Sequence, residues 1–279
     1  MTPTLVRQHL PHAGATPRVY LRARARDWAE IQERMLVPLY EAVHERLEVG
    51  GGTRLLGLGC GSGLALLLAA SRGAAVTGVD ADSPERLALA RERLLPEAWG
   101  THARADARIV AGSPSDLVDA NTPAYTLVTA FEPLGGAAGD SEGLVELVRE
   151  AAPLAERGAP VVLVGWGPPE RCATSAVLRE VAGPADTVRA DRRDDLEEVA
   201  QRAGFRPDGS GRVACPFGYA DVESAVRGLL STGLFDVALG ATDLVQVGKE
   251  LTEALQPHRR RDGTVWMPNV FRYLIARTR

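Results

Sequence analysis

The spacing of apolar residues identifies an amphipathic helix near the amino terminus. Apolar side chains recur at helical intervals at Trp28, Ile31, Met35, Leu39 and Ala42. Asp27 is placed to cap the start of this helix, and Pro38 predicts a kink or break near Val37. The three glycines at 50–52 end the segment in a loop. We expect residues 1–26, which mix prolines with several arginines, to form a flexible or lid-like arm.

From residue 53 to residue 166, short apolar runs alternate with helical segments. The expected strands are Thr53–Leu58, Ala75–Val79, Ile109–Ala111, Tyr125–Phe131 and Pro160–Gly165. The expected helices are Leu64–Ala70, a segment from Pro84 through Leu94 that Ser83 caps, and Glu142–Leu154. Alternation of this kind predicts an α/β fold with a parallel sheet and helices on both of its faces.

After Trp166 the alternation loosens. We expect helices at Leu196–Ala203, Val222–Leu230 and Thr242–Leu255, and strands at Val213–Cys215 and Val270–Ala276. We interpret residues 1–279 as a single domain. Its parts are an amino-terminal arm and cap helix at 1–50, a core at 51–166, and an insertion with closing strands at 167–279.

Composition and charge narrow the class of protein. The apolar content of 45% and the charged content of 24% suit a globular chain with a sizeable core. A net charge of −4 argues against a nucleic-acid-binding face. Three scattered cysteines, Cys60, Cys172 and Cys215, form neither a disulfide framework nor a metal cluster, so we expect a reducing compartment and no metal site.

The longest apolar run, near Leu64–Ala70, is too short to span a bilayer, and no signal-peptide pattern opens the chain. We therefore expect a cytoplasmic protein that binds neither membrane nor nucleic acid. The sequence leaves its oligomeric state open.

The candidate chemistry begins with a glycine loop between the first expected strand and the helix after it. Gly59, Gly61 and Gly63 form the pattern G-x-G-x-G, where glycine lets a ligand approach the backbone and the helix start offers free N–H groups. Asp80 ends the next strand 21 residues after Gly59 (80 − 59), close to the distance of about 20 expected for a carboxylate that binds ribose hydroxyls. A dinucleotide fingerprint needs a glycine at position 64, which is leucine here.

The glycine pattern resembles motif I of the class I S-adenosylmethionine-dependent methyltransferases. Further resemblances follow in the same order along the chain: Gly78–Ala81 after the second strand, Val110–Ser113 after the third, Leu127–Phe131 on the fourth, Trp166–Glu170 after the fifth, and the tail from Gly263 to Tyr273. The tail and the Trp166 segment are similar to the UbiE-like, type 11 methyltransferases of actinobacterial secondary metabolism.

The resemblance implies a doubly wound, mostly parallel seven-stranded sheet, the Rossmann-like methyltransferase fold, with an amino-terminal helical cap and a helical insertion. It implies S-adenosyl-L-methionine as cofactor and methyl transfer to a small organic molecule. The residues that it assigns to the cofactor are Gly57, Leu58, Gly59, Cys60, Gly61, Asp80, Ala81, Ser113, Pro114 and Phe131.

Three acids that are common in the family are missing: Gly57, Ser113 and Thr126 stand at their positions. A hydrogen bond to a charged group is worth about 1.5–3 kcal/mol, so each loss weakens cofactor binding. Two alternatives to methyl transfer therefore stay open. One is a methyltransferase fold used for other chemistry such as cyclisation, and the other is a cofactor-binding protein without catalysis.

No residue stands out as catalytic. His9 and His12 lie on the arm, His44 fits an exposed helix position, and His102 and His258 fall in loops. Glu132 follows the fourth strand at the edge where α/β sheets bind ligands, which suits a residue that orients substrate or cofactor. We expect Trp28, Trp166 and Trp266 either to line an apolar pocket or to pack in the core, and the arginines at 259–261 to be solvated.

Overall fold

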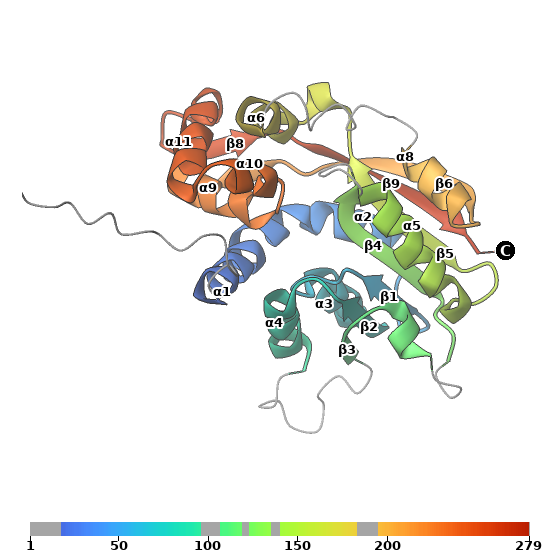
Figure 1. The fold of residues 1–279 in the computed structure, drawn as a ribbon. Helices are drawn as coiled ribbons and strands as arrows, with labels where there is room; N and C mark the ends of the chain where they lie inside the picture. The colour runs from blue at the N-terminus through green and yellow to red at the C-terminus, as the bar shows by residue number, and fades with distance from the viewer. Residues whose placement is uncertain (1–17, 96–106, 119–122, 135–139, 183–194, 279) are drawn as a thin grey trace, which may run out of the picture.

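A computed structural model describes residues 18–95, 107–118, 123–134, 140–182 and 195–278. Within them lies a seven-stranded sheet whose strands follow the order β3-β2-β1-β4-β5-β9-β6 (Figure 1). The strands are β1 (Arg54–Leu58), β2 (Ala75–Asp80), β3 (Ala107–Ala111), β4 (Leu127–Leu134), β5 (Pro160–Trp166), β6 (Arg206–Ala214) and β9 (Val270–Arg277). The first five are parallel, and β9 runs antiparallel to both β5 and β6. This confirms the predicted mostly parallel, seven-stranded sheet.

Side chains along each strand point alternately to the two faces of the sheet and so divide the hydrophobic core into two layers. On β1, Leu55 faces one layer and Leu56 and Leu58 face the other. One layer is covered by α2 (Val37–Arg46), α3 (Leu64–Ser71) and α4 (Pro84–Leu94), and the other by α5 (Asp140–Ala151) and α8 (Asp195–Arg202). Helices therefore cover both faces of the sheet, as the strand–helix alternation predicts.

The chain after β5 adds a group of helices beyond one end of the sheet, seen at the upper left of Figure 1. It comprises α6 (Ala173–Ala182), α9 (Val222–Ser231), α10 (Asp236–Ala241) and α11 (Leu244–Ala254), with a small antiparallel pair, β7 (Phe217–Tyr219) and β8 (Val265–Met267). The sequence predicts α9 and α11 but misses α6, α10 and the β7–β8 pair. It also makes β6 too short, because glycines and charged residues interrupt its apolar pattern.

Short 3-10 turns complete the described elements. They are η3 (Pro114–Leu117), η4 (Ala152–Leu154), η5 (Pro169–Arg171) and η6 (Gln256–His258). Among the helices that the structure describes, we find none with the length and apolar character needed to traverse a lipid bilayer.

The amino-terminal segment is more helical than the sequence suggests. It consists of α1 (Arg18–Asp27), a π-helical turn η1 (Trp28–Gln32), a 3-10 turn η2 (Glu33–Leu36) and then α2. The expectation of an arm is wrong for residues 18–26, and residues 1–17 lie outside the described part of the chain. Asp27 does not cap a helix, because its backbone is helical and continues α1 into η1. Pro38 does mark a break, since it stands in the first turn of α2.

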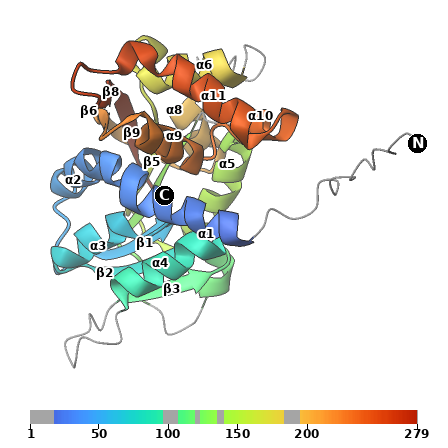
Figure 2. The ribbon, with the colours of Figure 1, turned by 90° about the vertical axis from the view of Figure 1, so that its left-hand side faces the viewer.

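Helix α1 lies between the core and the carboxyl-terminal helices. Figure 2 shows it between α4 on one side and α9 on the other, and it contacts both. Two ion pairs join the segment to the far end of the sequence, Arg24 to Asp236 at 2.6 Å and Arg227 to Asp27 at 3.1 Å. The amino-terminal segment thereby connects the sheet core, through α4, with the carboxyl-terminal helices, through α9.

The buried face of the amino-terminal segment is shifted by one residue from the predicted apolar face. From Trp28 onward the residues that it buries are Ala29, Gln32, Glu33, Leu36, Tyr40, Val43 and His44, together with Leu39. Three of them are polar, so hydrophobic spacing alone misses them, although Trp28, Ile31 and Met35 still pack partly buried against the core. The prediction that His44 is exposed is therefore wrong, because the residue is fully buried.

Gly63, the third glycine of the loop, provides a test of the fold. It has a φ of +79°, and a Cβ there would lie 3.0 Å from the Cβ of Ala90 on α4. We expect Gly63→Ala to lower the free energy of unfolding by about 1–2 kcal/mol through the left-handed backbone, and further through the lost α3–α4 contact.

Urea unfolding measures this loss. The matched control is Gly158→Ala, because Gly158 has a similar φ of +76° with nothing within 4 Å of its Cβ position. Equal losses in the two variants would show that the approach of α3 to α4 contributes nothing.

Candidate functional site

The glycine loop joins β1 to α3 at the carboxyl edge of the sheet. Gly59 and Gly61 both have a φ of +55°, a region that side-chain-bearing residues seldom adopt. The N–H of Cys60 donates to the carbonyl of Val79 at 3.1 Å and so holds the loop against β2. The loop therefore combines a backbone without side chains at its glycines and the amino-terminal end of a helix, which favours an anionic or polar ligand.

Asp80 ends β2 beside this loop, as the sequence predicts. One of its carboxylate oxygens accepts the N–H of Gly61 at 3.1 Å. The other accepts the N–H groups of Asp82 and Ser83 at 2.9 and 3.1 Å. The carboxylate thus fixes its own loop and the glycine loop while keeping acceptor capacity for a ligand.

The structure explains how the chain accommodates the three missing acids. A Cβ on Gly57 would lie 2.9 Å from Cδ2 of Leu66, so the leucine occupies the space of a side chain there. Ser113 caps η3, where Asp116 accepts its N–H at 2.8 Å. Thr126 lies just before β4, at the end of the sheet opposite the loop, and its Oγ1 accepts the N–H of Arg54 at 2.9 Å.

A small cavity of about 40 Å³ lies directly on the glycine loop. Its lining includes seven of the residues predicted to bind cofactor: Gly57, Leu58, Gly59, Cys60, Gly61, Asp80 and Phe131. The other three, Ala81, Ser113 and Pro114, line neither this cavity nor the larger one described next, and Pro114 is buried. The assignment of these ten residues to a cofactor stays a prediction.

A larger cavity of about 440 Å³ opens beside the loop, under the carboxyl-terminal helices. Leu58, Gly59, Asp82, Ala130, Glu132 and Pro133 form its floor, and α5 forms one side with Gly143, Leu144 and Leu147. The remaining lining residues are Trp28, Gln32, Leu36, Trp166, Phe217, Thr232, Gly233, Leu234 and Phe271. This volume falls within the range of small-molecule sites, about 300–1,000 Å³.

Aromatic rings form one wall of the larger cavity. Trp166 at the end of β5 packs against Phe271 with ring centroids 4.6 Å apart, and against Phe217 at 6.2 Å. Trp166 therefore lines a pocket, as one of our two expectations has it. Trp266 does not, because it lies on β8 with 39% of its surface exposed and Arg260 stacked over its ring. The arginines at 259–261 are exposed, as predicted.

Trp28 lies where the two cavities meet and covers part of the glycine loop. Its Nε1 is 3.5 Å from the position of a Cβ on Gly61. That Nε1 is buried and has no hydrogen-bond partner among the residues that the structure describes. The guanidinium of Arg86 stacks on the indole at 4.3 Å and donates to the carbonyl of Ser231 at 2.5 Å. Burial lowers the pKa of Arg86, and nearby Glu132 partly offsets this effect.

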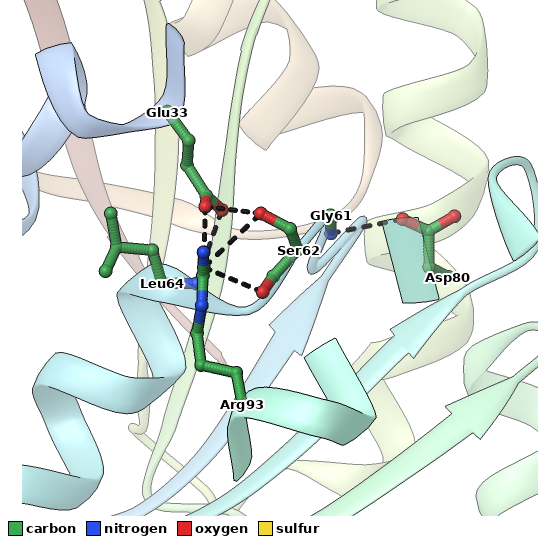
Figure 3. Close-up of polar contacts among 6 residues, drawn as sticks. All are labelled: Glu33, Gly61, Ser62, Leu64, Asp80 and Arg93. Atoms are coloured by element: carbon green, nitrogen blue, oxygen red, sulfur yellow. Dashed lines mark hydrogen bonds and ion pairs between the residues drawn. The ribbon is translucent and has the colours of Figure 1, made fainter. Parts of the chain in front are cut away.

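Glu33 is a site residue that sequence reasoning misses. It comes from η2, and only 3% of its side chain is exposed. Its Oε2 accepts the hydroxyl of Ser62 and pairs with Arg93 at 2.8 Å, and its Oε1 accepts the N–H of Leu64 at 3.3 Å. Figure 3 shows the carboxylates of Glu33 and Asp80 on opposite sides of the loop.

Cys60 and the histidines that the structure describes are poorly suited to catalysis at this site, whereas Glu132 lines it. Burial raises the pKa of the Cys60 thiol to about 12, so it stays protonated at neutral pH. His258 lines neither cavity, and His9, His12 and His102 lie outside the described residues. Glu132 lines both cavities, with one carboxylate oxygen 3.5 Å from the position of a Cβ on Gly59. Among the described residues, no group of histidines, cysteines and acids could hold a metal ion.

Comparison with solved structures identifies the fold. The chain resembles a SAM-dependent methyltransferase from Thiobacillus denitrificans in complex with S-adenosyl-L-homocysteine, with a TM-score of 0.53, 18% identity and coverage of 95% of this chain and 100% of that one. It also resembles a SAM-dependent methyltransferase from Geobacter sulfurreducens in complex with the same ligand, with a TM-score of 0.51, 20% identity and coverage of 92% and 98%.

A third similar structure has a different activity. The [4+2]-cyclase SpnF matches with a TM-score of 0.51 and 19% identity over 86% of this chain and 80% of that one. No family model matches the chain. No curated protein matches it either. At these identities the likeness establishes the class I methyltransferase fold. It does not establish which reaction the chain catalyses.

His44 allows a test of the packing behind the loop, because its ring lies 5.9 Å from that of Phe131. Burial, helped by Arg72, lowers the pKa of His44 from 6.5 to about 4. Between these values the unfolded chain binds a proton that the folded chain does not. This contribution to stability is therefore complete above pH 6.5 and falls as the pH drops towards 4, by at most about 3 kcal/mol.

We expect His44→Leu to flatten the dependence of unfolding free energy on pH between 6.5 and 4. Urea unfolding across this range measures the slope. His258→Gln is the matched control and should leave most of the slope in place, because His258 is partly exposed. An unchanged slope in His44→Leu would contradict the burial argument.

Proposed function

We propose that this chain is an enzyme that binds S-adenosyl-L-methionine on the glycine loop and transfers its methyl group to a small, largely apolar molecule. The observation that carries the proposal is the meeting of three features at one edge of the sheet. They are the left-handed backbone at Gly59 and Gly61, the Asp80 carboxylate against it, and a cavity of about 440 Å³ beside it.

The residues present fit such a cofactor. Gly59 and Gly61 carry no side chain where its methionine end would lie, and Asp80 keeps acceptor capacity for its ribose. The buried Nε1–H of Trp28 has no hydrogen-bond acceptor among the described residues, and a ligand carboxylate could accept it. When bound, the cofactor supplies an electrophilic methyl group on a sulfonium centre. The chain's own part is then to hold the acceptor in line and to keep water out.

The character of the larger cavity supports an apolar acceptor. Four aromatic residues and five leucines line it, against two acids, Asp82 and Glu132. No lysine or arginine is among its described lining residues, so nothing there compensates the charge of an anion. Glu132 is the carboxylate nearest to Gly59 and is suited to orient a proton-bearing group of the acceptor or to accept its proton.

A second candidate function is chemistry without methyl transfer, such as cyclisation. The observation that favours it is Gly57, where Leu66 fills the space of the missing acid. The likeness to a [4+2]-cyclase is compatible with this alternative. Assignment to the UbiE-like type, to secondary metabolism and to the cytoplasm is also part of our proposal, and it rests on the sequence alone.

Binding of cofactor can be measured directly. Isothermal titration with S-adenosyl-L-homocysteine should show one site per chain. The cavity on the loop holds only about 40 Å³, and Trp28 lies against Gly61 in its lining, so we expect a ligand there to displace the indole. We therefore expect a change in tryptophan fluorescence on binding that Trp28→Phe removes and Trp266→Phe does not. Absence of heat at millimolar ligand would exclude the proposed function.

Substitutions at Asp80 test the ribose contact. We expect Asp80→Asn to weaken S-adenosyl-L-homocysteine binding by about tenfold or more, because a charge-assisted hydrogen bond is lost. The amide oxygen can still accept backbone N–H groups, so the melting temperature should fall less than in Asp80→Ala.

Asp82→Ala is the control, because Asp82 is exposed and its side chain makes none of the hydrogen bonds that hold the loop. Equal, small losses of affinity at both positions would show that neither carboxylate contacts the ribose.

A further inference from the structure

We infer that Glu33 supplies the carboxylate that motif I lacks at Gly57, and that it binds the ammonium group at the methionine end of the cofactor. The inference rests on the proposed function. It concerns a residue 24 positions before Gly57 in the chain (57 − 33), on a different element, which the motif comparison cannot identify.

The first argument is that the side chain of Leu66 occupies the space of the usual acid at Gly57. Gly57 pairs with Gly78 across β1 and β2, and the side chain of Leu66 lies over both glycines. Its methyl carbons are 2.9 Å and 2.6 Å from the Cβ positions of Gly57 and Gly78. Gly57 has no left-handed φ, so an acid there would leave the backbone unstrained but would require the Leu66 side chain to move. With glycine at 57 and Leu66 in this space, a carboxylate at the loop comes from another element.

The second argument is the position of Glu33 on the loop. Glu33 lines the small cavity together with Gly57, Gly59 and Gly61. Its Oε1 is 3.9 Å from the Cβ position of Gly61, on the side of the loop that Trp28 covers. A ligand that displaces the indole from Gly61 therefore meets Oε1.

The third argument is the uneven use of the two carboxylate oxygens. Oε2 is engaged by the hydroxyl of Ser62 and by the guanidinium of Arg93. Within the described part of the chain, Oε1 receives one long hydrogen bond, of 3.3 Å, from the N–H of Leu64. An ionised carboxylate oxygen accepts about two hydrogen bonds, so Oε1 has capacity for one more, and an ammonium group is a donor of matching charge.

Glu33 is also held rigidly enough to be selective. Its carboxylate is buried, and its contacts come from α4 through Arg93 and from the start of α3 through Ser62 and Leu64. A buried charge with fixed partners is oriented before the ligand arrives, which favours a donor at one particular position. Glu132 is the competing carboxylate, because it also lines the small cavity, on the Gly59 side.

The test compares three ligands on the intact chain by isothermal titration. They are S-adenosyl-L-homocysteine, its analogue without the amino group, and 5′-methylthioadenosine, which lacks the whole amino-acid end. We expect the wild-type chain to bind S-adenosyl-L-homocysteine about ten- to a hundredfold more tightly than the deaminated analogue. In Glu33→Gln this ratio should fall to near one, while the affinity for 5′-methylthioadenosine stays within about twofold.

Ser62→Ala is the matched structural control. It removes one partner of Glu33 but keeps the carboxylate, so it should lower the melting temperature and leave the ratio intact. Glu132→Gln should also leave the ratio intact.

A wild-type ratio near one, an unchanged ratio in Glu33→Gln, or a selective loss in Glu132→Gln would overturn the inference while binding of 5′-methylthioadenosine still supports the adenosine site. Failure of all three ligands to bind the wild-type chain would overturn the proposed function and the inference with it.

Discussion

The site depends on one constraint, that the parallel strands of a sheet end at a single edge. Because β1, β2, β4 and β5 are parallel, their carboxyl ends bring together the glycine loop, Asp80, Glu132 and Trp166. None of these groups is close to the others in the sequence. The sheet places them, and the helices on its two faces supply the burial that stabilises it.

Closure of the site depends on a second feature, the buried contact between the amino-terminal segment and the loop. The Glu33–Arg93 pair, with Ser62, joins η2, α4 and the start of α3. A buried ion pair is weak evidence for net stability, but removal of one partner leaves an unpaired charge, so the pair favours one docking geometry over others. That geometry places Trp28 on Gly61 and makes the segment both a wall of the larger cavity and a cover for the loop.

The fold by itself leaves two kinds of chemistry open, since similar structures include methyltransferases and a [4+2]-cyclase. What separates methyl transfer from other chemistry is which carboxylates lie at the glycine loop. The motif acid is replaced by glycine and leucine packing, while Glu33 and Glu132 bring carboxylates to the same loop from other elements. A count of acids within the motif therefore underestimates the number of carboxylates at the site.

The sequence by itself determined the β-α alternation, the glycine loop and Asp80, because these depend on local periodicity and on short-range backbone chemistry. It placed β1 to β5 and helices α3, α4 and α5 close to their observed bounds. Only the tertiary structure decided the buried face at residues 29–44, where Gln32, Glu33 and His44 are inside and a π-helical turn alters the helical phase. Whether a polar side chain is buried depends on the partners that other segments bring to it, as Arg93 and Ser62 do for Glu33. Such partners are distant in sequence, so hydrophobic spacing cannot reveal them.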